Sequence, residues 1–129
     1  MQVIFYFPDL TNETTMTIGE IVDAVQGEVM CGEDRMFEVV EYAFASDLMS
    51  DVLTIKTDNF LLVTGLANVQ SIRTAEMSDV RYIIFVRGKA VTDEMIDLAD
   101  ENGMVVICTD YSMFKTSGIL YSAGLKPVY

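Results

Sequence analysis

The chain has 129 residues, which is enough for one domain and too few for two separate hydrophobic cores. Hydrophobic residues make up 51% of it, so we expect a packed core rather than a disordered chain. Eight Lys and Arg stand against 20 Asp and Glu, and the net charge of −12 disfavours binding to nucleic acids and to anionic membrane surfaces.

The two cysteines, Cys31 and Cys108, lie far apart and have no CxxC spacing. They predict two reduced thiols, as is typical of a cytoplasmic protein. The chain has no histidine, so Ser-His and Cys-His catalysis lose their usual base and zinc loses a common ligand. No apolar run approaches the roughly 20 residues that a membrane-spanning helix needs. We expect a cytoplasmic protein without a metal site or a cofactor.

Residues 1–15 are expected to form an amino-terminal extension before a domain over residues 16–129. The first seven residues are apolar, but no basic residue precedes them and Pro8 and Asp9 interrupt the run, so they do not resemble a secretory signal. Met16 is an alternative start for the chain. Val3–Phe7 has the composition of an added edge strand.

A helix is expected directly after this extension. Thr17 and Glu20 have the spacing of a capping box at a helix start. Apolar residues then recur with helical spacing and predict one buried face, and Gly27 ends the segment. The residues of this face are Ile18, Ile21, Val22 and Val25.

Two strands and a short helix are expected next. Val29–Cys31 predicts a short strand, and Phe37–Ala45 is rich in strand-forming residues and predicts a second one. Ser46 and Asp47 have the character of an N-cap for a short helix over residues 48–53.

The second half of the chain repeats a regular unit in which a continuous apolar run is followed by a helix. Thr92 and Asp110 are expected to cap the last two of these helices. Apolar strands without alternation indicate a parallel sheet that is covered on both faces. We therefore predict a single α/β domain with three α/β/α layers and a mostly parallel central sheet. The three runs are Phe60–Thr64, Arg81–Val86 and Met104–Cys108.

Ligands of open parallel α/β sheets bind outside the carboxyl ends of the strands. In this chain small, polar and charged residues follow each expected strand, and free amides at helix starts favour an anion there. Arg87 and Lys89 are two of only eight basic residues and suit a phosphate or carboxylate ligand. The predicted ligand-binding residues are Ser46, Asp47, Thr64, Gly65, Asn68, Arg87, Gly88, Lys89, Thr109 and Asp110.

Each of these residues also has a purely structural interpretation. Helix capping explains the serine and aspartate positions, backbone turns explain the glycines, and surface ion pairs explain the basic residues. Asp47 and Asp51 are four residues apart and fit either a carboxylate pair or a solvated acidic face. The nucleotide motifs GxGxxG and GxxxxGK[ST] and the hydrolase motifs GxSxG and HExxH are absent from the sequence.

Several stretches, in this order and spacing, resemble the DRTGG domain family from about Thr17 to Leu125. One departure is clear, because the Asp-Arg-Thr-Gly-Gly motif of the family belongs just before Ala45 and here residues 39–44 read Val-Val-Glu-Tyr-Ala-Phe. The stretches that carry the resemblance are residues 44–52 (FASDLMSDV), 62–66 (LVTGL), 73–77 (RTAEM), 84–89 (IFVRGK), 109–114 (TDYSMF) and 120–125 (LYSAGL).

The resemblance implies a small three-layer α/β/α fold, similar to the amino-terminal domain of HPr kinase and, more distantly, to the UDP-binding domain of MurF-type ligases. Members of the family stand alone or beside CBS domains and phosphate acetyltransferase modules, which implies a regulatory role. The leading hypothesis is a non-catalytic module that senses a nucleotide or another small anionic metabolite. The alternative is a homodimeric or enzyme-associated interaction subunit without a small ligand.

Overall fold

The computed structural model describes residues 15–129, and the proposed edge strand at Val3–Phe7 lies outside the described residues. Six strands form the main sheet in the spatial order β2-β7-β6-β5-β4-β8. Strands β4 to β8 run parallel, and β2 is antiparallel to β7 at one edge. The strands are β2 (Glu28–Cys31), β4 (Tyr42–Ala45), β5 (Phe60–Thr64), β6 (Tyr82–Phe85), β7 (Val105–Cys108) and β8 (Lys126–Pro127).

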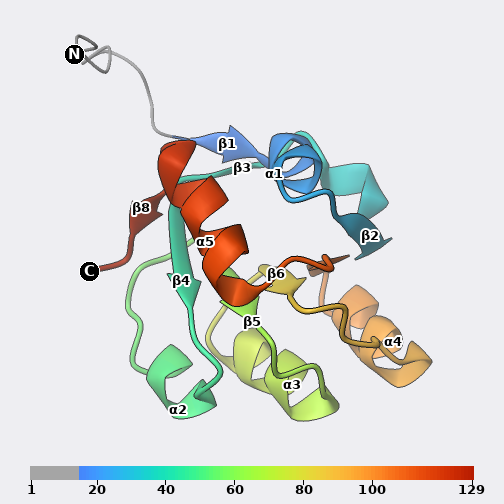
Figure 1. Ribbon diagram of the computed structural model, residues 1–129. Helices are drawn as coiled ribbons and strands as arrows, with labels where there is room; N and C mark the ends of the chain where they lie inside the picture. The colour runs from blue at the N-terminus through green and yellow to red at the C-terminus, as the bar shows by residue number, and fades with distance from the viewer. Residues whose placement is uncertain (1–14) are drawn as a thin grey trace, which may run out of the picture.

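Helices cover both faces of this sheet, as the apolar strands require (Figure 1). One face packs against α1 (Ile18–Ala24) and α5 (Met113–Ser122). The other packs against α2 (Met49–Val52), α3 (Val69–Met77) and α4 (Asp93–Glu101). The prediction of a single three-layer α/β domain with a mostly parallel sheet is confirmed.

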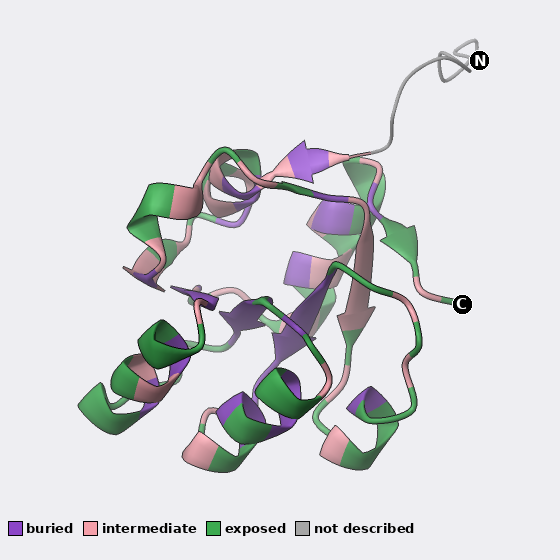
Figure 2. Ribbon diagram, turned by 180° about the vertical axis from the view of Figure 1, so that it is seen from behind, coloured by how far each residue is buried: buried purple, intermediate pink, exposed green. Residues whose placement is uncertain are grey.

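The core is divided between the two faces by the alternation of side chains along each strand. In β5, Leu61 and Val63 join the cluster under α1 and α5, whereas Phe60 and Leu62 join the cluster under the other helices. All four side chains are buried, as are those of the neighbouring strand β6. Figure 2 shows these central strands buried and the outer surfaces of the helices exposed.

The expected single strand over Phe37–Ala45 is wrong. The chain forms two separate strands here, β3 (Val39–Val40) and β4. Strand β3 pairs antiparallel with β1 (Met16–Thr17), outside the main sheet, and β4 enters the main sheet beside β5. The two are separated at Glu41, whose carbonyl accepts a hydrogen bond from the N–H of Lys126. Strand propensity does not specify the partner of a strand, and tertiary pairing divides this run.

Two of the predicted N-caps are confirmed. The hydroxyl of Thr17 accepts from the N–H of Glu20, whose carboxylate accepts from the N–H of Thr17 in return, so the capping box is complete. Thr92 caps α4 by accepting from the N–H of Met95 at 3.2 Å.

Two other predicted caps are wrong. The last helix is capped by Ser112 and not by Asp110, because the chain continues two residues further before it turns into α5. The N-cap position of α2 is Leu48, which makes no side-chain cap bond. Ser46 instead accepts from the N–H of Leu48, and the carboxylate of Asp47 turns toward β5.

Candidate functional site

The carboxyl ends of the parallel strands lie side by side, because their registers are aligned. Ala45 pairs with Val63 at the ends of β4 and β5, and Thr64 pairs with Phe85 at the ends of β5 and β6. The loops after these strands therefore meet at one edge of the sheet. Here the structure brings Asp47, Thr64, Gly65 and Arg87 together, and we call these four residues the strand-end cluster.

Asp47 makes the closest contacts of the strand-end cluster. Its Oδ1 accepts from the N–H of Gly65 at 2.7 Å and from the hydroxyl of Thr64 at 3.1 Å. The Gly65 N–H bond, with smaller contributions from Thr64 and Arg87, lowers the pKa of Asp47 below its ordinary value. Asp47 therefore stays ionised in the cluster at neutral pH.

Arg87 supplies the positive charge, and its backbone is strained. Its φ of 67° lies in the left-handed region, which a long side chain seldom adopts and which is often associated with functional sites. The N–H of Arg87 donates to the carbonyl of Tyr111 at 2.8 Å, and the N–H of Gly88 donates to that of Thr109 at 3.0 Å. These two bonds hold the strained loop against the loop that follows β7.

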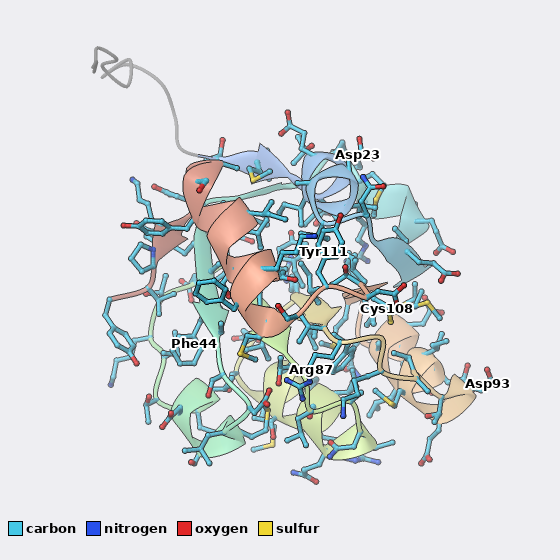
Figure 3. The ribbon with its side chains drawn as sticks, viewed as in Figure 1. Asp23, Phe44, Arg87, Asp93, Cys108 and Tyr111 are labelled. Atoms are coloured by element: carbon cyan, nitrogen blue, oxygen red, sulfur yellow. The ribbon has the colours of Figure 1, made fainter. Side chains whose placement is uncertain are left out.

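The guanidinium of Arg87 reaches back over the end of β5. A Cβ at position 65 would lie 2.7 Å from Nη1 of Arg87 and closer still to the rest of the group, so glycine is needed for this approach. Nη2 lies 3.7 Å from Oδ2 of Asp47. Figure 3 shows Arg87 at the ends of the central strands, between the start of α5 and α3.

The cluster lies beside a point where the connections that follow two neighbouring strands pass to opposite faces of the sheet. After β6 the chain passes to α4 on one face, and after the neighbouring β7 it passes to α5 on the other face. Such switch points are where open α/β sheets bind their ligands. Arg87 and Gly88 follow β6, and Thr109 and Asp110 follow β7, so both predicted pairs flank this point.

Several of the other predicted site residues bond to the chain itself. The buried hydroxyl of Thr109 donates to the carbonyl of Val25 at 2.7 Å. Asn68 caps α3 by accepting from the N–H of Ser71 at 2.8 Å. Lys89 and Asp110 are exposed at the rim, and Asp110 lies beside Gly88. Ligand contacts of all the predicted residues stay a prediction.

A second feature, an apolar groove, was missed by the sequence analysis. It lies between α5 and the edge formed by β4 and β8 and has a volume of about 320 Å³. Beside it Phe114 is 90% exposed and Tyr121 is 71% exposed, so two aromatic side chains at the groove are open to solvent. We call it the α5 groove; its lining includes Ala43, Ala45, Phe114, Gly118, Tyr121 and Leu125.

Of the two cysteines, Cys31 is buried and Cys108 is half-buried. Burial raises the pKa of the Cys31 thiol and raises that of Cys108 to about 11, so both thiols stay protonated and unreactive near neutral pH. Over residues 15–129 no group of three His, Cys, Asp or Glu side chains is placed to hold a metal ion. In the same range no helix is both long and apolar enough to cross a membrane.

Comparison with protein families gives a match to the DRTGG domain over residues 20–123. The chain belongs to the DRTGG domain family. This confirms the resemblance of the sequence, although the residues before Ala45 in β4 lack the glycines that give the family its name. No curated protein matches the chain.

A solved structure has the same fold as this DRTGG domain. It is the crystal structure of the CBS and DRTGG domains of the regulatory region of Clostridium perfringens pyrophosphatase, complexed with its activator diadenosine tetraphosphate. The TM-score is 0.67 at 20% sequence identity, and the match covers 84% of this chain and 46% of that one. The chain thus spans about half the length of that structure, and the likeness supports the fold.

Proposed function

We propose that this DRTGG domain is a non-catalytic regulatory module of the cytoplasm that binds a nucleotide or another small anionic metabolite at the strand-end cluster. The observation that carries the proposal is the placement of Arg87. A strained backbone holds its guanidinium over Gly65, beside the switch point of the sheet and next to the buried donors at the end of β5, the Thr64 hydroxyl and the Gly65 N–H. A guanidinium with convergent hydrogen-bond donors is well suited to bind phosphate or carboxylate.

The solved relative supports the choice of a nucleotide as the first ligand to test. That regulatory region is complexed with a dinucleotide activator, and a ligand of this kind carries several phosphoryl groups. A non-catalytic role is supported by the raised pKa values of both thiols and by the absence of histidine from the chain. The strongly negative net charge requires a local cation for any anionic ligand, and Arg87 supplies one.

Calorimetric titration tests this function. The full chain is titrated with a panel of adenine and uridine mono-, di- and triphosphates and with diadenosine tetraphosphate. We expect saturable binding of at least one compound, with affinity that falls as the salt concentration rises because a charge pair contributes. Folded protein that gives no heat with any compound of the panel would contradict the proposed function.

A second function, that of a homodimeric subunit, is favoured by the α5 groove. Residues 111–129 contain Lys115 and Lys126 but no Asp or Glu, whereas acidic residues are spread over the rest of the chain. Two copies of so acidic a protein repel each other least where this stretch faces its counterpart. We propose a second copy of this chain as the occupant of the groove, with Phe114 and Tyr121 as the apolar contacts.

Size-exclusion chromatography with light scattering tests the homodimer. A concentration-dependent dimer supports it. A strict monomer over the whole concentration range would rule out a second copy as the occupant of the groove. The ligand proposal does not depend on this result, because the strand-end cluster and the groove share no residues.

A further inference from the structure

The carboxylate of Asp47 lies where the strand-end cluster would hold a ligand anion. Its Oδ1 receives two hydrogen bonds, from the N–H of Gly65 and the hydroxyl of Thr64, and its Oδ2 faces the guanidinium of Arg87 at 3.7 Å. Proteins bind carboxylate and phosphate groups with this combination of a backbone amide, a hydroxyl and a guanidinium. In this structure all three groups contact Asp47, a side chain of the chain itself.

This contact is not explained by helix capping. Asp47 precedes α2 but does not cap it, because Leu48 holds the N-cap position and its N–H is bonded by Ser46. The N–H of Gly65 lies outside α3, which is capped by Asn68. The carboxylate therefore joins the loop after β4 to the loop after β5, and neither helix needs it in order to begin.

The receiving groups and the carboxylate differ in how firmly they are held. Thr64 is fully buried at the end of β5, and Gly65 is buried beside it. The side chain of Asp47 is 48% exposed and that of Arg87 is 42% exposed. An ion pair this open to water contributes little, so the carboxylate is held mainly by its two hydrogen bonds, and the groups that donate them are fixed by the end of β5.

We propose that Asp47 is an internal competitor, which a phosphoryl or carboxylate group of the ligand displaces from Gly65, Thr64 and Arg87. Displacement frees the loop between β4 and α2, because Asp47 belongs to this loop. Ligand binding is thereby coupled to the surface around α2. The inference rests on the proposed function and adds to it the ligand group and the moving segment. Because Asp47 occupies the site in most molecules, the apparent affinity equals the intrinsic affinity multiplied by the fraction of molecules in which the site is open.

The charge state of Asp47 agrees with this role. Hydrogen bonds from Gly65 and Thr64 favour the ionised carboxyl and lower its pKa. The cluster thus already stabilises an anion at this position.

The test is calorimetric titration of the full chain with inorganic pyrophosphate and, separately, with ADP. Asp47→Ala removes the competitor, Asp47→Asn removes the charge but keeps an amide of the same shape, and Asp97→Ala removes an exposed carboxylate of α4 that lies outside the predicted site. We expect Asp47→Ala to bind about tenfold more tightly than the wild type, because the site is always open. The affinity of Asp47→Asn should lie between that of the wild type and that of Asp47→Ala, and Asp97→Ala should change the affinity by less than about twofold, as expected of a screened surface charge.

The outcomes separate this inference from the proposed function. If the wild type binds and Asp47→Ala gains no more affinity than Asp47→Asn or Asp97→Ala, the gain is simple charge repulsion and the inference fails, while the function stands. If no variant binds either probe, both fail. If Asp47→Ala binds ADP more tightly than the wild type does but not pyrophosphate, the site takes a phosphoryl group that is attached to a nucleoside. If it binds both probes more tightly, the phosphoryl group alone is sufficient. Circular dichroism of each variant confirms the fold, and all three substitutions fall on exposed positions.

Discussion

The strand-end cluster and the α5 groove differ in how they are built. The cluster is polar, has one strained arginine and lies where parallel strands end, whereas the groove is apolar and lies along a helix beside a sheet edge. A few fixed donors around one charge suit a small anion, and a long apolar groove between exposed aromatic side chains suits a protein surface. We therefore propose that ligand binding and association use separate surfaces of this domain.

The largest expected effect is on the cluster side of this comparison. Arg87→Ala removes the guanidinium, and we expect ligand affinity to fall by roughly 10- to 100-fold, since hydrogen bonds to charged groups contribute about 1.5–3 kcal/mol. Lys89→Ala, two residues along the exposed rim, is the matched control and should reduce affinity by less than about fivefold. Calorimetry measures both, and light scattering should show unchanged association. Equal losses in the two variants would mean that binding depends on general charge and not on the cluster.

The next effect is on the groove side. Phe114→Ser removes an exposed aromatic side chain, and we expect the dimer to weaken by about tenfold or more, because aromatic residues at the centre of an interface often contribute over 1 kcal/mol. Phe37→Ser is the control, since Phe37 is 75% exposed but does not line the groove. Sedimentation equilibrium gives both dissociation constants. Loss of ligand affinity in Phe114→Ser would show that the two regions are coupled.

A smaller effect is expected from the glycine that follows Arg87. Gly88 has a φ of 65°, and Gly88→Ala should cost about 1–2 kcal/mol, the usual penalty of a left-handed backbone for a residue with a Cβ. Gly118→Ala, in α5, should be neutral or slightly stabilising, because nothing lies near the added Cβ and alanine is the better helix former. Urea denaturation measures both changes. A destabilised Gly118→Ala would show that the groove is more tightly packed than its open volume indicates.

The smallest effect is on the acid side of the stability profile. The pKa of Asp47 is lowered in the folded protein, so its stabilising contribution is present above the unfolded pKa of about 3.8 and is lost as the pH falls through the folded value. Asp47→Asn should remove this part of the pH dependence, and the loss at neutral pH should stay below about 1 kcal/mol because the pair is exposed. Phe114→Ser should leave the profile unchanged. The free energy of unfolding is measured by denaturation at several pH values below 5. Identical acid profiles for wild type and Asp47→Asn would contradict the contacts described for this carboxylate.

The sequence was a good guide to the central strands and to the rim at their ends. The runs at β5, β6 and β7 are apolar throughout because both faces are buried, and this pattern is local in the sequence. Parallel strands then gather the residues after them at one edge, so Thr64, Gly65 and Arg87 could be placed together. The orientation of Asp47 could not be predicted, because a residue before a short helix fits a capping role equally well.

The groove could not be predicted, because it depends on contacts between distant parts of the chain. Strand β8 has two residues, one of them Pro127, and pairs with β4 across more than eighty positions of the sequence. Proline is tolerated there only because β8 lies at the edge of the sheet. The one available signal was the stretch from Tyr111 to Tyr129, which has exposed aromatic residues and no acidic residue. The division of Phe37–Ala45 into β3 and β4 was also missed, because it depends on pairing with the distant strands β1 and β5.

The central claim is that the ends of β5 and β6 form the anion site, and NMR titration of the labelled full chain with ADP tests it most directly. We predict saturable shifts of the Gly65 amide and of the Arg87 side-chain resonances with one common dissociation constant, and no shift of the Gly118 amide in the α5 groove. Saturable shifts at Gly118, with Gly65 and Arg87 unchanged, would contradict it.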